Sequence, residues 1–320
     1  MTGKEVELRP AEAAGEIERI VGMLREAVRG ARRKGVVVGI SGGIDSSVVA
    51  ALCARAFGPG RVLGLTMHED ESSHDTRRLA RLVIETLGIA TLDEPLSPIL
   101  EAAGCYARRD DAIRAVIPEY GEGWRCKLVL PSVIDTEQLR ISSVVGRSPD
   151  GREVRARLPA EAYLQVVAAT NFKQRARKML EYYHADRLNY AVAGTPNRLE
   201  YELGFFVKNG DGAADVKPIA HLYKTQVYQL AELLGIPAEI RARPPTTDTF
   251  SLPQSQEEFY FSLPYQRMDA CLWACDHDVP AEEVAAAFGL TPAQVERVYR
   301  DIAAKRAVAR HLHAAPRRLG

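Results

Sequence analysis

An unbroken apolar run at residues 36–40 (VVVGI) predicts a strand that is buried on both of its faces. A glycine-rich turn follows, and apolar residues at helical spacing over residues 46–57 predict a helix with Ser46 at its N-cap. A second buried strand over residues 61–67 and a second helix over residues 75–87 repeat this order. Alternating strands and helices predict an α/β fold, a doubly wound parallel sheet of the Rossmann-like type with right-handed crossovers.

The same patterning organises the rest of the chain. Residues 96–159 are less regular and are interpreted as an inserted arm, in which Ser148-Pro149-Asp150-Gly151 joins two strands of a hairpin. We expect residues 1–250 to form one domain that contains this arm, and residues 251–320 to form a helical C-terminal extension. The other predicted elements are an amphipathic helix at 10–32, hairpin strands at 139–145 and 153–158, a long helix at 159–185, a short buried strand at 190–193 and a helix at 218–234.

The turn after the first strand, Ser41-Gly42-Gly43-Ile44-Asp45-Ser46, has the features of an anion site. The dipole of the following helix favours negative charge, and Gly42 and Gly43 allow a phosphate to approach the main chain. Asp45 beside a bound phosphate requires a bridging cation, which points to Mg²⁺. Neither the Walker A pattern nor G-x-G-x-x-G is present here. An ordinary tight turn between strand and helix is the alternative interpretation.

Composition narrows the class of protein. Lys+Arg and Asp+Glu balance at 42 each in 320 residues, so no net positive field favours nonspecific nucleic-acid binding. No apolar run reaches membrane-spanning length and the first ten residues are charged, so we expect a cytoplasmic protein without a membrane or nucleic-acid partner. The five cysteines are scattered, which favours reduced thiols over a zinc site.

The S-G-G-x-D-S turn resembles the pyrophosphate loop of the ATP pyrophosphatases, which cleave ATP to AMP and pyrophosphate. Five further motifs follow in order: N-x-x-x-R-x-R, G-T-x-N-x-x-E, G-F-F-x-K-x-G-D-G-x-x-D, L-x-K-T and P-T-x-D. Together, over residues 36–248, they resemble the NAD synthetases, ligases that use ATP and ammonia to amidate deamido-NAD. The resemblance implies an adenine-nucleotide alpha-hydrolase fold, Mg²⁺, a homodimer, and ATP, ammonia and deamido-NAD as small-molecule substrates.

The resemblance also implies roles for individual residues. The ATP site would comprise Gly39, Ser41, Gly42, Gly43, Asp45, Ser46, Thr195, Lys224 and Thr246. Asp45 and Glu200 would bind Mg²⁺. Deamido-NAD would be held by Asn171, Arg175, Lys208, Asp215 and Lys305. The residues nearest the reacting groups would be Asp45, Lys208, Asp211 and Tyr182, the last two beside ammonia.

The chemistry requires these residue types. A carboxylate is a poor electrophile, and adenylation by ATP activates it while charge builds on the departing pyrophosphate, where Mg²⁺, lysines and loop amides stabilise it. Ammonium must lose a proton before it attacks, and Asp211 is suited to orient it or accept the proton. Taken singly, each residue favours a structural interpretation over a functional one: Glu200 as a helix-face charge, Lys208 as a solvated loop lysine and Arg175 as a helix-surface partner of Glu181 or Asp186. The ordered set favours function.

Several alternatives stay open. The arm is longer than expected for the family by about forty residues, and Ala304-Lys305 stands where a His-Lys pair is common, so another carboxylic acid is an alternative acceptor. Residues 282–300 resemble a helix-turn-helix with Gln294, Arg297 and Arg300 on its second helix, which would suit a nucleotide-sensing DNA-binding protein; a packed helical extension is favoured. No cysteine lies in a glutaminase motif, so ammonia would be free or come from a separate glutaminase.

Overall fold

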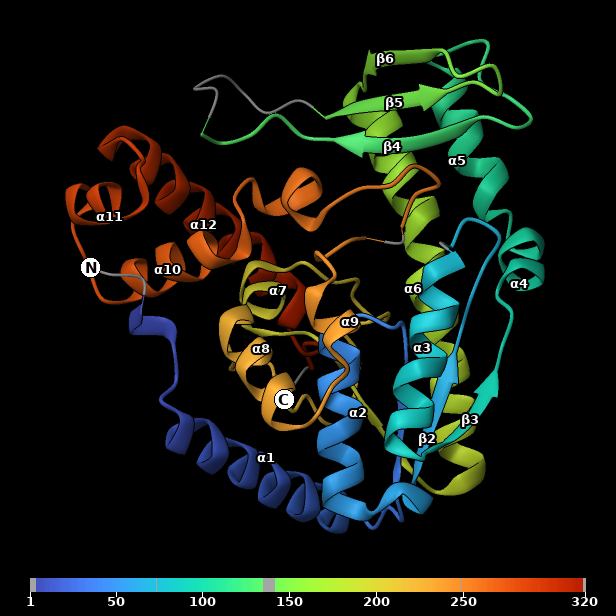
Figure 1. The fold of residues 1–320 in the computed structure, drawn as a ribbon. Coiled ribbons are helices and arrows are strands. Elements are labelled where there is room, and N and C mark those ends of the chain that lie inside the picture. The colour runs from blue at the N-terminus through green and yellow to red at the C-terminus, as the bar shows by residue number, and fades with distance from the viewer. Residues whose placement is uncertain (1–3, 73, 135–141, 248, 319–320) are drawn as a thin grey trace.

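The computed structural model describes residues 4–72, 74–134, 142–247 and 249–318. Its centre is a four-stranded sheet with the order β3-β2-β1-β7, in which every pair is parallel (Figure 1). Strand order reverses between β1 and β7, so the loops that follow these two strands diverge from a common point where ligands bind in α/β folds. The strands are β1 (Val36–Gly39), β2 (Val62–Thr66), β3 (Ala90–Asp93) and β7 (Ala191–Ala193).

Helices cover both faces of this sheet, as expected for a doubly wound fold. Val36 and Val38 of β1 pack into the core on one face, and Val37 packs with Leu63 and Val192 into the core on the other. This alternation follows from the period of two in a strand, and it explains why β1 is apolar throughout. The first face is covered by α1 (Pro10–Gly30), α2 (Ile44–Phe57), α3 (His74–Leu87) and α8 (Lys224–Leu233), and the second by α6 (Ala160–Leu188).

The arm forms a second, antiparallel sheet of order β4-β5-β6. The predicted hairpin is confirmed in its described part, since Gly151 adopts φ +89° in the turn and Ser148 N donates to Arg152 O at 2.9 Å. Residues 139–141 of the first predicted strand lie outside the described residues. The arm's elements are α4 (Ser97–Ala102), α5 (Cys105–Arg114), β4 (Arg125–Val129), β5 (Ser143–Arg147) and β6 (Glu153–Arg157).

A buried ion cluster joins the arm to the central sheet. Lys173 of α6, 1% exposed, places its Nζ 2.7 Å from Glu71 and 3.0 Å from Glu69, both in the loop after β2. Arg109 of α5 lies 2.6 Å from the other oxygen of Glu71. The charges therefore compensate one another inside the protein, which burial requires of them.

The arm also contacts the segment before α10 (Tyr265–Asp276). Arg125 Nε donates to the Ser251 carbonyl at 2.8 Å, and Lys127 Nζ lies 2.6 Å from Glu258. These two basic residues of β4 thus attach the arm to the C-terminal half of the chain.

The C-terminal helices pack on one another and on the rest of the molecule. Thr291 caps the last helix as its position predicts, and Val295 is fully buried. Arg297 donates to the carbonyls of Val133 at 3.0 Å and Ile134 at 2.9 Å, so this residue of the helix-turn-helix hypothesis binds the arm. The contacts are those of a packed helical extension. The helices are α10, α11 (Ala281–Phe288) and α12 (Pro292–His313).

Two helix starts differ from the sequence prediction. The N-cap of α2 is Gly43, and Ser46 lies in the first turn, so Ser46 is not the cap. The helix predicted from residue 218 begins at Lys224, because Asp269 of α10 accepts hydrogen bonds from the backbone N–H groups of Lys224 at 3.2 Å and Thr225 at 2.7 Å. Such capping by a residue far along the chain leaves no local sequence signal.

The remaining elements are short. Within the described ranges, no helix has an apolar stretch long enough to cross a membrane. These elements are η1 (Lys4–Val6), η2 (Pro59–Arg61), α7 (Arg198–Leu203), α9 (Ala238–Ala242) and a π-helical turn, η3 (Glu257–Phe261).

Candidate active site

The loop between β1 and α2 is shaped to accept an anion at the carboxyl end of the sheet. Gly42 has φ +72°, and a Cβ there would lie 2.7 Å from Leu79 Cβ of α3, so only glycine fits. The hydroxyls of Ser41 and Ser46 lie 3.2 Å apart, and Ser46 Oγ donates to Gly43 O at 3.1 Å. No side chain caps the start of α2, which leaves the N-terminal N–H groups of this helix available to a phosphate.

Asp45 occupies the first turn of α2 and faces the loop after β7. Its carboxylate forms an ion pair with Nζ of Lys224, at the start of α8, and accepts a hydrogen bond from Asn197 Nδ2 at 3.1 Å. Lys224 is 2% exposed. Burial alone would lower the pKa of Lys224, but Asp45 and Glu200 outweigh it and raise that pKa, so the lysine is charged. Three segments distant in sequence therefore meet at the point where strand order reverses.

Glu200 is the second carboxylate of this group. Asn197 caps α7, with its Oδ1 accepting from Glu200 N at 3.2 Å and its own N–H donating to Glu200 Oε2 at 3.1 Å. Gln256 Nε2 donates to the other oxygen at 3.0 Å. Burial, and next the charge of Asp45, raise the pKa of Glu200 above its usual range, and Lys224 only partly offsets them.

These residues fit a magnesium ion. Two carboxylates share one lysine, and the raised pKa of Glu200 means that one more positive charge would stabilise the ionised pair. Mg²⁺ is normally held by one or two carboxylates together with substrate phosphates and waters. Among the described residues, no cluster of three or more His, Cys, Asp or Glu side chains is found, so these side chains do not surround a metal ion by themselves.

A second charged group lies on the α6 side of the loop. A Cβ on Gly39 would lie 3.0 Å from Glu181 Oε1, so the end of β1 touches this carboxylate. Glu181 pairs with Lys178 at 2.5 Å rather than with Arg175. Lys178 also interacts with Asp211. Burial raises the pKa of Asp211, and this shift is opposed by the hydrogen bond from Val207 N at 2.7 Å, by the charge of Lys178 and by other local interactions. Asp211 is thus an acid with a raised pKa beside a lysine, as a proton acceptor for ammonium requires.

Tyr182 and Asp215, both predicted site residues, lie together. Tyr182 Oη is 3.5 Å from one Asp215 oxygen, and Val192 N donates to the other at 2.8 Å. Burial and then the charge of Asp215 raise the pKa of Tyr182 to about 12, so its hydroxyl is a donor.

Arg175 and Lys208 form a further group at the end of α12. Arg175 Nε donates to Lys208 O at 3.4 Å. Lys208 Nζ donates to the carbonyls of His311 at 2.9 Å and Ala314 at 3.2 Å, so it caps the last turn of this helix. The structure therefore adds a contact with the C-terminal helix that the sequence did not predict.

Other predicted residues lie apart from these groups. Lys305 Nζ donates to Tyr260 O at 2.7 Å and pairs with Asp301 at 2.6 Å, which places it in the packing between α12 and η3. Thr195 lies two residues after β7 and is half-buried, and exposed Thr246 forms a bridge with Ser255. Half-buried Asn171 lies on α6. The roles of these residues stay predictions.

Comparison with known proteins identifies the family. Residues 16–115 and 134–310 match the family model described as NAD synthase. The chain belongs to the NAD synthase family. It is 60% identical over 306 residues to a Mesorhizobium japonicum protein named NH(3)-dependent NAD(+) synthetase, covering 95% of this chain and 96% of the relative. A Thermotoga maritima protein of the same name is 34% identical, over 88% of this chain and 92% of its own length.

Solved structures show the same fold. The NMN synthetase of Francisella tularensis superposes with a TM-score of 0.66 at 23% identity, covering 98% of this chain and 99% of the other. The NH3-dependent NAD synthetase of Campylobacter jejuni, in complex with nitrate, superposes with a TM-score of 0.61 at 22% identity, over 96% and 99%. The α/β fold of the adenine-nucleotide alpha-hydrolase type expected for the family is therefore present here.

Sequence reasoning missed part of this site. In the sequence, Asn197 is noted only as a position of the G-T-x-N-x-x-E motif. Asn followed three residues later by Glu is also a capping-box signature, and that signal could have identified Asn197. Lys178 and Glu181 lie inside the long helix, where charged residues usually face solvent, and only the packing of α6 on β1 reveals that they are buried.

Proposed function

We propose that this chain is an ammonia-dependent NAD synthetase, which adenylates the carboxylate of deamido-NAD with ATP and amidates it to NAD, with AMP and pyrophosphate as products. The observation that carries the proposal is the meeting of the glycine loop, Asp45, Lys224 and Glu200 where strand order reverses. The curated relatives of the same name support it.

In the first step, the chain's own groups stabilise the departing pyrophosphate. Loop N–H groups at the start of α2 bind its oxygens, and Lys224 presents a buried positive charge. Mg²⁺, held by Asp45 and Glu200, would neutralise phosphate charge in this step. Asn197 keeps both carboxylates oriented, since it hydrogen-bonds to each.

In the second step, ammonia displaces AMP from the acyl-adenylate. Asp211 accepts a proton from ammonium, and its raised pKa makes this carboxylate a stronger base than an ordinary aspartate. Lys178 lies beside Asp211 and interacts with its charge once the carboxylate is ionised. Asp215 and Tyr182 offer an acceptor and a donor to the substrate nearby.

We further propose that two copies associate through the exposed side of α6. Leu164, Met179 and Tyr183 are large apolar or aromatic side chains of this helix, and they are 63%, 54% and 60% exposed. Arg175, expected to hold deamido-NAD, lies on the same side and is exposed, so a second copy would close over it. Analytical ultracentrifugation should give a dimer, and Met179→Glu should give a monomer; a wild-type monomer at micromolar concentration refutes this.

A product assay tests the activity. The chain is mixed with ATP, Mg²⁺, ammonium and deamido-NAD, and AMP and NAD are followed together; equal formation of both is expected. Asp45→Asn and Glu200→Gln should lower the rate by about a hundredfold or more, while Glu282→Gln, an exposed acid of α11, should match wild type.

The acceptor acid is tested in the same assay. The acid corresponding to NMN is the competitor, because the NMN synthetase of Francisella tularensis shares this fold. Preference for that acid would refute deamido-NAD as the substrate while keeping the adenylation chemistry. Ammonia supply is tested by adding glutamine alone, which should give no NAD unless a separate glutaminase is present.

A further inference from the structure

A second cavity lies at the opposite end of β1 and α2 from the phosphate loop. It has a volume of 710 Å³ and is lined where α1 and α2 end and where the chain enters β1 and β7. Phe57, the last residue of α2, and Lys34, just before β1, both line it. Because the glycine loop joins the other ends of these elements, the cavity is separate from the candidate active site.

The lining of this cavity is strongly basic. Two of the five cations have partners in the fold: Arg25 Nε donates to the Ala56 carbonyl at 2.8 Å at the end of α2, and Arg33 donates to an asparagine oxygen at 3.1 Å. The other three make no ion pair with any residue that the structure describes, and no acidic residue is among the described lining residues. These three are Arg29, Lys34 and Arg61.

The need to balance the negative C-terminal ends of the helices does not account for all five cations of the cavity. The carbonyl ends of α1 and α2 attract cations, and Arg25 meets that need at α2. Three further exposed cations line one concave space, and no acidic residue among the described lining residues offsets their charge. The arrangement therefore favours a ligand that carries several negative charges.

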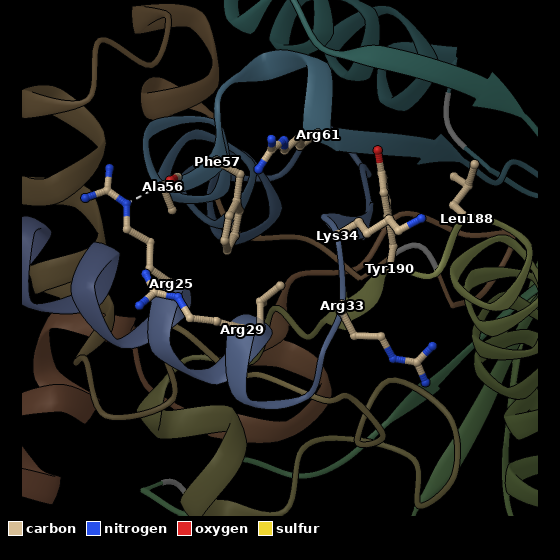
Figure 2. Close-up of a pocket in the computed structure, with 10 residues that line it drawn as sticks. Arg25, Arg29, Arg33, Lys34, Ala56, Phe57, Arg61, Leu188 and Tyr190 are labelled. Atoms are coloured by element: carbon tan, nitrogen blue, oxygen red, sulfur yellow. Dashed lines mark hydrogen bonds between the residues drawn. The ribbon is translucent and has the colours of Figure 1, made fainter.

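Two aromatic rings complete the lining. Figure 2 shows the ring of Phe57 directed into the space between α1 and Tyr190. Tyr190 lies against the backbone of Gly35, where a Cβ would be 2.7 Å from the tyrosine Cζ, so the glycine allows the ring this position. Rings beside cations are the combination that binds a nucleobase and its phosphates.

We propose that this cavity binds a nucleoside polyphosphate, with its phosphates on Arg29, Lys34 and Arg61 and its base against Phe57 or Tyr190. The volume is in the range of small-molecule sites, about 300–1,000 Å³, which suits a single nucleotide. This site is independent of the proposed synthetase activity.

The test separates the two sites by their need for Mg²⁺. In EDTA, phosphates at the active site meet two carboxylates, Asp45 and Glu200, that share one lysine, whereas the described residues that line the cavity include no carboxylate. GTP is titrated against the full chain in EDTA by calorimetry, with hydrogen exchange followed by mass spectrometry to locate it. We expect one GTP per chain and protection of residues 25–34 and 55–62. Protection confined to residues 39–48, or no binding, overturns the proposal.

Variants sharpen the result. Arg29→Ser with Arg61→Ser should raise the Kd for GTP about tenfold or more, and the control Arg77→Ser with Arg81→Ser, which removes two exposed charges from α3, should leave it unchanged. Inorganic tripolyphosphate should bind more weakly than GTP because it has no base. Equal affinities for the two probes, or equal loss in both variants, overturns the nucleotide assignment, and binding of an acidic protein or nucleic acid in place of GTP does the same.

Discussion

Asn197→Ser is the substitution that most directly tests how the two carboxylates are held. Asn197 is 1% exposed and links both of them, since it donates to Asp45 at 3.1 Å and caps the helix that carries Glu200. Serine is as good an N-cap as asparagine, so the cap of α7 remains. The lost group is the amide that donates to Asp45, because the serine side chain is too short to reach it.

The size of the effect follows from these contacts. A hydrogen bond to a charged group contributes about 1.5–3 kcal/mol, so the free energy of unfolding should fall by about that amount or less. Asp45 is then oriented by Lys224 alone, and loss of such a supporting contact typically weakens metal affinity by about 10–100-fold. Asn197→Ala should show the same metal defect and lose about 1 kcal/mol more, because the cap is also removed.

The assay is AMP formation at saturating ATP over a range of Mg²⁺ concentrations, with urea unfolding measured on the same protein. Thr291→Ala is the matched control, since it removes the cap of α12, where Thr291 Oγ1 accepts from Gln294 N at 3.2 Å, away from the candidate active site. It should lose about 1 kcal/mol of stability and keep the wild-type Mg²⁺ dependence. A Mg²⁺ dependence within twofold of wild type in Asn197→Ser would refute the reasoning.

Three other predictions follow from single contacts. The raised pKa of Glu200 means that Mg²⁺ competes with a proton, so the Mg²⁺ concentration for half-maximal rate should rise as pH falls below that pKa; a pH-independent value would contradict this. Gly42→Ala should lower the melting temperature and weaken ATP binding, because its φ of +72° and the approach to Leu79 exclude a Cβ; calorimetry of ATP binding measures it. Lys173→Met should cost about 3–5 kcal/mol because it leaves the buried carboxylates of Glu69 and Glu71 with one cation fewer to compensate them, and recovery of stability in the double variant with Glu71→Gln checks the cause.

The central sheet was predictable because its signals are local. A run of apolar residues identifies β1 without any partner, and a turn with Gly151 at φ +89° identifies the hairpin of the arm. β4 was not predicted, since its residues alternate basic and apolar around Arg125 and Lys127, whose partners Ser251 and Glu258 lie more than a hundred residues further along the chain. Its position depends on those distant contacts.

In the candidate site, too, the residues with local sequence signals were predictable and the contacts between distant segments were not. Asp45 and Glu200 were predicted from motifs, each within a few residues of the glycine or threonine that marks it. Their coupling was not, because Lys224 and Asn197 reach Asp45 across 179 and 152 positions of sequence. The prediction of Ser46 as the N-cap was wrong because its hydroxyl forms hydrogen bonds within the loop. The sequence pattern does not indicate in which direction this hydroxyl points.

The balance of charge around Asp45 supports the proposal that this site binds ATP with a metal rather than ATP alone. When both carboxylates are ionised, one buried lysine leaves one negative charge uncompensated, and burial makes that charge costly, which is why the pKa of Glu200 is raised. A phosphate chain without a cation would add to that charge, whereas Mg²⁺ with the chain would neutralise it. The N–H groups at the start of α2 have no side-chain cap and would bind phosphate either way, so we expect the carboxylates to make binding depend on the metal. On this proposal, the pairing of Asp45, Lys224 and Glu200 selects the metal complex of ATP.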